Sequence, residues 1–69
     1  MPESVYKIVE VVGSSAESWE KAAAAAVQRA ASSLRDLRVA QVVEQDIHME
    51  DGKIHAYRTK LKLSFKMED

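Results

Sequence analysis

The stretch His55-Ala56-Tyr57-Arg58-Thr59-Lys60-Leu61-Lys62-Leu63-Ser64-Phe65-Lys66-Met67 decides the fold. Residue type alternates along its whole length. Successive side chains of a strand point to opposite faces, so the alternation predicts a β-strand with one apolar and one basic face. A helix would instead scatter the apolar groups around its circumference. The apolar face carries His55, Tyr57, Thr59, Leu61, Leu63, Phe65 and Met67; the basic face carries Ala56, Arg58, Lys60, Lys62, Ser64 and Lys66.

Two earlier segments are also predicted to be strands. Residues 5–12 are rich in β-branched side chains and end at Gly13. This first strand is apolar on both faces, and a single helix can cover only one of them. We therefore expect its other face to meet a second subunit. Residues 39–49 form the second predicted strand, in which both faces are mixed.

A hairpin joins the second and third strands. Glu50-Asp51-Gly52-Lys53 contains the Asp-Gly pair that is typical of a two-residue turn. The helix returns the chain, so the second strand runs parallel to the first, and a third strand placed between them makes every pairing antiparallel. The prediction is one α+β domain over residues 1–69. Its order is β-α-β-β, its strand order is first–third–second, and the helix lies on the apolar face.

The helix is predicted to begin at Gly13-Ser14-Ser15-Ala16-Glu17 and to run to about Asp36. Ser14 can cap the helix, and Glu17 completes a capping box. The same turn could bind an anion, but no glycine-rich fingerprint surrounds it. Apolar residues recur at helical spacing, and a stripe made mainly of alanine lets the helix approach the sheet closely. The stripe comprises Trp19, Ala22, Ala23, Ala26, Val27, Ala30, Leu34 and Leu37.

Length and composition exclude several classes of protein. Sixty-nine residues lie near the lower limit for a self-sufficient core, and there is no cysteine to staple it. His48 and His55 stand alone in the sequence, so no zinc motif is predicted, and oligomerisation is the expected source of stability. A net charge of −1 argues against nucleic-acid binding. The apolar run of residues 22–27 is too short to span a membrane, and no signal-peptide pattern precedes it, so a cytoplasmic protein is expected.

The sequence predicts no catalytic set. There is no cysteine nucleophile, and neither His48 nor His55 has a partner, so both are interpreted as exposed residues beside the turn. A non-enzymatic protein is expected. Trp19 is interpreted as a core or interface anchor. The basic face of the third strand meets either Glu44 and Asp46 or Gln41 and Gln45, depending on register. It forms either an ion-paired surface or a site for a polar ligand.

The chain as a whole resembles the dodecin family. The resemblance rests on residues 5–15, the helix through Leu34-Arg35-Asp36-Leu37, the Asp51-Gly52 hairpin and Phe65-Lys66-Met67-Glu68. It implies a β-α-β-β protomer whose sheet wraps one long helix. It also implies a hollow, tetrahedral homo-dodecamer that stores a small ligand, with ligand sites near subunit contacts. Family members that bind flavins stack the ring between tryptophans of neighbouring subunits.

The flavin-binding residues of the family do not transfer. The stacking tryptophan corresponds here to Val39, in Leu37-Arg38-Val39-Ala40. The family's Arg-Gly corresponds to Asp46-Ile47, and the glutamine that holds the flavin corresponds to Arg58. An aliphatic side chain offers no π-face, and the loss is about 1 kcal/mol or more per face. Trp19 does not replace the missing ring, because it sits at the opposite end of the helix.

The chain resembles more closely a subgroup without that tryptophan, which includes a calcium dodecin. The shared motifs are Ser18-Trp19-Glu20 and Val42-Val43-Glu44-Gln45-Asp46. Glu44 and Asp46 are hard oxygen ligands on alternate positions of one strand, so they share a face, and symmetry copies could gather several carboxylates around calcium. The alternative is that they pair with Arg58, Lys60 or Lys62.

Three functions stay open from the sequence. One is sequestration of a small, flavin-type ligand such as riboflavin, FMN or lumichrome. Another is a calcium site at Glu44 and Asp46, and the third is a scaffold without a ligand. The candidate residues for the small ligand are Val39, Gln41, Gln45, Asp46 and Arg58.

Overall fold

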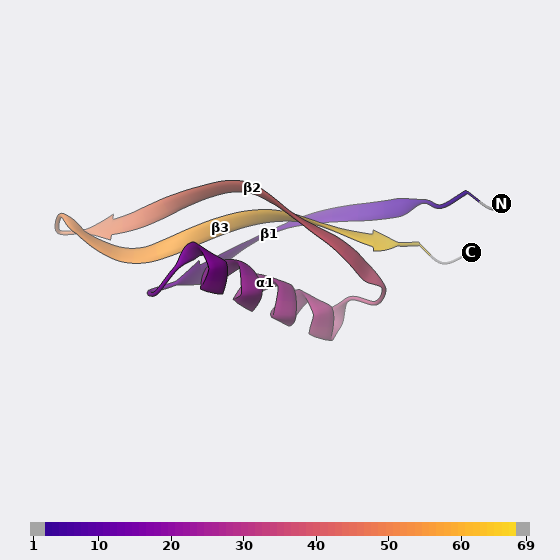
Figure 1. Ribbon diagram of the computed structural model, residues 1–69, viewed down its shortest axis with the longest axis horizontal. Helices are drawn as coiled ribbons and strands as arrows, with labels where there is room; N and C mark the ends of the chain where they lie inside the picture. Colours follow the sequence, from indigo (N-terminus) through magenta and orange to yellow (C-terminus); the bar gives the residue numbers. More distant parts are fainter. Residues whose placement is uncertain (1–2, 68–69) are drawn as a thin grey trace.

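A computed structural model describes residues 3–67 as three strands and one helix in the order β-α-β-β (Figure 1). The elements are β1 (Tyr6–Ser15), α1 (Trp19–Ser33), β2 (Leu37–Glu50) and β3 (Lys53–Lys66). The sheet has the order β1-β3-β2, and β3 pairs antiparallel with both neighbours. The predicted fold class, strand order and hairpin are confirmed.

The apolar face of β3 is the centre of the core. Thr59, Leu61 and Leu63 are buried there, and Ala22 of α1 is buried against them. The Thr59 hydroxyl donates a hydrogen bond of 3.0 Å to the carbonyl oxygen of Trp19, so this buried polar group is satisfied. The alternation of β3 therefore predicts correctly which face the helix covers.

The alanine stripe brings α1 very close to β1. A Cβ atom added to Gly13 would lie 2.1 Å from the carbonyl oxygen of Ala22 and 2.9 Å from the Cβ of Ala26. The residues of α1 that are buried or half-buried belong to the predicted stripe, whereas Gln28 and Arg29 are exposed. Gly13 is thus the point at which the helix crosses the sheet.

The predicted ends of the helix are wrong. Ser14 does not cap α1, because β1 continues through Ser15, and the helix begins at Trp19, six residues after Gly13. Ser18 is the cap, and its hydroxyl oxygen accepts a hydrogen bond of 3.0 Å from the amide of Lys21. The helix stops at Ser33, before the predicted Asp36. The physical reason is that Gly13 serves close packing inside a strand and not a turn.

Much of the molecule lacks cover. It measures 54 × 20 × 14 Å, and the β2–β3 hairpin extends past the start of α1 (Figure 1). The accessible surface is 5337 Å², against about 4,300 Å² for a typical monomer of this mass. No residue of β2 is buried. Exposed large apolar side chains on the strands are Tyr6, Ile8, Val12, Val39, Val42, Val43, Ile47, Met49 and Ile54.

The outer face of β1 fits the expectation of a second partner. Ile8 and Val12 are both 56% exposed, whereas Val9 and Val11 on the opposite face are partly covered.

Within residues 3–67, no helix has the length and apolar character needed to cross a membrane.

Candidate functional site

Charged residues meet across the outer face of the sheet, opposite α1. The register pairs Asp46 with Arg58 and Glu44 with Lys60. Directly paired residues of antiparallel strands share a face, so the carboxylates of β2 meet the cations of β3. This decides the register that the sequence left open, and it places Glu44 and Asp46 on one face as predicted.

Asp46 and Arg58 form a bidentate ion pair. The Arg58 Nε donates to Oδ1 of Asp46 and its Nη2 donates to Oδ2, both at 2.7 Å. These hydrogen bonds from Arg58 lower the pKa of the Asp46 carboxyl, although partial desolvation opposes the shift. The same bonds raise the pKa of Arg58. Asp46 is therefore held ionised, with both carboxylate oxygens already accepting hydrogen bonds.

A small pocket lies beside this pair. It has a volume of about 150 Å³ and is lined by Val12, Glu44, Asp46, Arg58 and Lys60. Lys60 turns toward β1, where its Nζ lies 3.8 Å from Oε1 of Glu10. Glu44 forms no ion pair with any residue from 3 to 67, and its charge acts on Arg58 only through space. Glu44 is thus the carboxylate of the pocket that has oxygens available.

The other predicted ligand residues do not all gather here. Val39 pairs with Ser64 and Gln41 pairs with Lys62, so both lie on the outer face with Asp46 and Arg58. Val39 is 54% exposed and lies roughly 20 Å along β2 from Asp46. Gln45 pairs with Thr59, so it occupies the opposite face. Four of the five candidates therefore share a face, but they do not form one pocket within a single chain.

Trp19 connects the start of α1 to this strand. Its indole Nε1 donates a hydrogen bond of 3.0 Å to the carbonyl oxygen of Asp46. Its ring meets Tyr57 edge-on, with centroids 5.1 Å apart. Within the described chain Trp19 thus acts as an anchor between elements, and it lies far from Val39 on β2.

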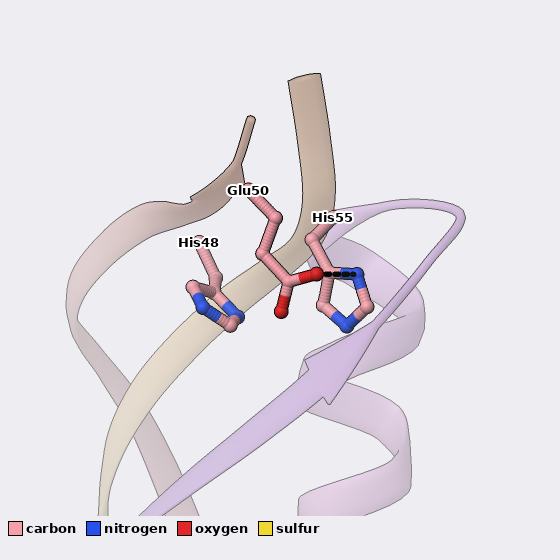
Figure 2. Close-up of side chains that lie close together, drawn as sticks. All are labelled: His48, Glu50 and His55. Atoms are coloured by element: carbon pink, nitrogen blue, oxygen red, sulfur yellow. Dashed lines mark ion pairs between the residues drawn. The ribbon is translucent and has the colours of Figure 1, made fainter. Parts of the chain in front are cut away.

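The two histidines are exposed beside the turn, as predicted, but the prediction that neither has a partner is wrong. Figure 2 shows His48, Glu50 and His55 pointing toward one another near the tip of the hairpin. One ligand-type atom from each lies within 4.8 Å of the others. A two-residue turn pairs Glu50 with Lys53, and His48 lies opposite Ala56, the residue that follows His55. The turn motif therefore contained the signal that would have found this cluster.

Comparison with known proteins gives a consistent family. The dodecin family model matches residues 5–68. A protein named calcium dodecin from Mycobacterium tuberculosis is 53% identical over 64 residues, which cover 93% of this chain and 90% of the relative. A dodecin from Thermus thermophilus is 37% identical over 65 residues, or 94% of each chain.

Solved structures agree with the sequence comparisons. Dodecin from Streptomyces coelicolor superposes with a TM-score of 0.91 at 35% identity, covering 100% of this chain and 99% of that chain. The M. tuberculosis calcium dodecin, described as a calcium-chelating antigen with a novel calcium-binding site, has a TM-score of 0.83 at 56% identity, with 94% and 93% covered. Sequence and structure together show that the chain belongs to the dodecin family.

Proposed function

We propose that this chain is a non-enzymatic dodecin whose homo-oligomer binds calcium on the outer face of the sheet. The observation that supports it most directly is the pocket in which Glu44 has free carboxylate oxygens beside Asp46. The relative that is 53% identical is named a calcium dodecin. Carboxylate oxygens are the ligands that calcium prefers.

The site is completed by neighbouring chains. Calcium takes about six to eight oxygen ligands, and one chain brings only two carboxylates to this pocket. Asp46 is held by Arg58, so Glu44 is the first ligand, and Asp46 offers its remaining lone pairs. Copies of the chain that meet over this face would supply further carboxylates. The exposed apolar residues of β1 and β2 favour such contacts, and a dodecameric shell is the assembly that we propose.

Calcium should then stabilise the assembly. We expect EGTA to lower the melting temperature of the purified oligomer and added calcium to restore it, because a ligand that binds only the folded state adds stability. Glu44→Gln keeps the shape of the side chain, removes its charge and should abolish the calcium response. His55 lies outside the pocket, so His55→Asn should leave the calcium response of the melting temperature intact. A melting curve that EGTA does not change would refute the proposal.

A second candidate is a small planar ligand of the flavin type, bound between subunits. The supporting observation is that Val39, Gln41, Asp46 and Arg58 share the outer face. Val39 gives an apolar wall, and the polar side chains suit the edges of a ring system. Equilibrium dialysis against riboflavin, FMN and lumichrome tests this function, and no saturable binding of any of them would exclude it.

A further inference from the structure

A second cluster of ligand-type side chains lies at the tip of the hairpin, beyond the pocket. Oε1 of Glu50 is 3.6 Å from Nδ1 of His55, and the ring of His48 meets that of His55 edge-on with centroids 5.0 Å apart. Figure 2 shows the Glu50 carboxylate between the two imidazoles. All three residues are exposed. His48 and His55 are the two histidines of the sequence, and both belong to this cluster.

The fold explains why the three side chains converge. His48 and Glu50 occupy alternate positions of β2, so they project from the same face. The register passes from His48 opposite Ala56 to Met49 opposite Ile54, which leaves His55 as the extra residue of a β-bulge. A bulge re-aims its side chain. Asp51 and Gly52, with φ of 51° and 73°, close the turn that holds both strands in this register.

We propose that His48, Glu50 and His55 form a site for a divalent ion of the zinc class, with water as the fourth ligand. Zinc binds imidazole nitrogen and carboxylate oxygen at about 2.0–2.2 Å. The ligands of a tetrahedral site at those lengths lie about 3.3 Å apart. The atoms here lie within 4.8 Å of one another, so small side-chain rotations bring all three onto one ion. Exposed side chains at a hairpin tip can rotate in this way.

The choice of ion follows from the donors. Two imidazoles and one carboxylate suit zinc and its neighbours in the transition series, whereas calcium takes oxygen ligands only. The site is therefore separate in chemistry from the pocket of Glu44 and Asp46, although all of these side chains follow one another along the same face of β2. A bound ion would link β2 to β3 at the end of the hairpin that α1 does not support.

Calorimetric titration of the oligomer with zinc chloride, in a buffer without chelator or phosphate, tests the site. We expect one zinc ion per chain. Loss of an outer-shell partner typically weakens metal binding by about 10–100-fold, so loss of a direct ligand in His48→Asn or His55→Asn should cost at least as much. Glu20→Gln, which removes an exposed carboxylate of α1 outside both sites, is the matched control and should bind zinc like the wild type. Cobalt should show the visible absorption of a tetrahedral ion, and this band should disappear in both histidine variants.

Each other result would overturn the site. The first two are the absence of saturable zinc binding and a zinc affinity in both histidine variants equal to that of the wild type. The others are a stoichiometry below one ion per chain and displacement of zinc by an equal concentration of calcium. Circular dichroism checks that the variants fold, which is expected because both histidines are exposed. If one variant misfolds, the other variant and the cobalt spectrum of the wild type still decide. Zinc binding can fail while the calcium response of the melting temperature persists, so the two proposals fail separately.

Discussion

Replacing Gly13 by alanine should be among the most damaging single-methyl changes in the chain. The new Cβ would lie 2.1 Å from the carbonyl oxygen of Ala22, whereas an ordinary contact needs 3.4 Å or more. The obstacle is a backbone atom of α1, which cannot rotate away as a side chain can. The whole helix must therefore move from the sheet by about 1 Å or more, and it loses packing against Leu61 and Leu63.

The energy can be estimated from overpacking in other cores. Forcing extra methyl groups into a well-packed site costs about 1–3 kcal/mol, and a rigid backbone contact places Gly13→Ala at the upper end. A domain of this length is stable by only about 3–10 kcal/mol in total. A loss of about 3 kcal/mol would lower the melting temperature by roughly 12–24 °C.

Thermal melting followed by circular dichroism measures this loss. All variants should be compared at one protein concentration, because the stability of an oligomer depends on it. Gly52→Ala is the matched control. Nothing lies within 4 Å of its added Cβ, so its positive φ of 73° is the sole cost, about 1–2 kcal/mol.

A double variant separates the two close contacts of Gly13. Ala26→Gly removes the atom at 2.9 Å and leaves the Ala22 carbonyl at 2.1 Å, so Gly13→Ala combined with Ala26→Gly should show no rescue. Glycine in the helix adds a further cost of about 1 kcal/mol. The reasoning is refuted if Gly13→Ala melts within about 3 °C of wild type, or if Ala26→Gly restores its stability.

Substitutions at three further positions test other contacts. Asp46→Asn should reduce the acid sensitivity of folding. The lowered pKa of Asp46 gives stability that is complete above the ordinary value of 3.8 and is lost as pH falls through the lowered value. Stability from urea denaturation should therefore depend less on pH between about pH 5 and pH 2, and an unchanged profile would contradict this. Trp19→Phe removes the hydrogen bond to the Asp46 carbonyl and should cost about 1 kcal/mol, whereas Trp19→Ala should cost more, toward about 3 kcal/mol, without changing any flavin affinity seen in dialysis. Leu61→Ala empties a buried position and should cost about 2–5 kcal/mol in urea denaturation; a loss below 1 kcal/mol would mean that α1 does not seal the core there.

The parts of the fold that were predicted correctly are those with strong local patterns. Alternation along β3 gives its covered face, and Asp51-Gly52 gives the hairpin and hence the antiparallel pairing. The alanine stripe identifies the side of α1 that packs. The start of the helix was misplaced because glycine followed by serines suits both a cap and a tight crossing. Only the tertiary contact between Gly13 and Ala22 distinguishes the two.

The candidate sites divide along similar lines. Alternation alone places Glu44 and Asp46 on one face. The bidentate bond from Arg58 depends on the register between the strands, which the β-bulge at His55 displaces by one residue from simple counting back from the turn. The histidine pair does not follow from linear spacing, because His48 and His55 are seven residues apart and meet only where the hairpin brings β2 and β3 together.

The absence of any buried residue in β2 has a consequence for how the protein reaches its native state. β2 pairs with β3 along its length but buries no side chain within its own chain, so in the proposed oligomer its cover would come from neighbouring subunits, and folding and assembly would be coupled. The later steps of this coupled process are then bimolecular, and their rate should rise with concentration. A newly made chain at low concentration would present two unprotected sheet edges, which are templates for irregular pairing. The level of expression would thus help to decide between the proposed shell and aggregation.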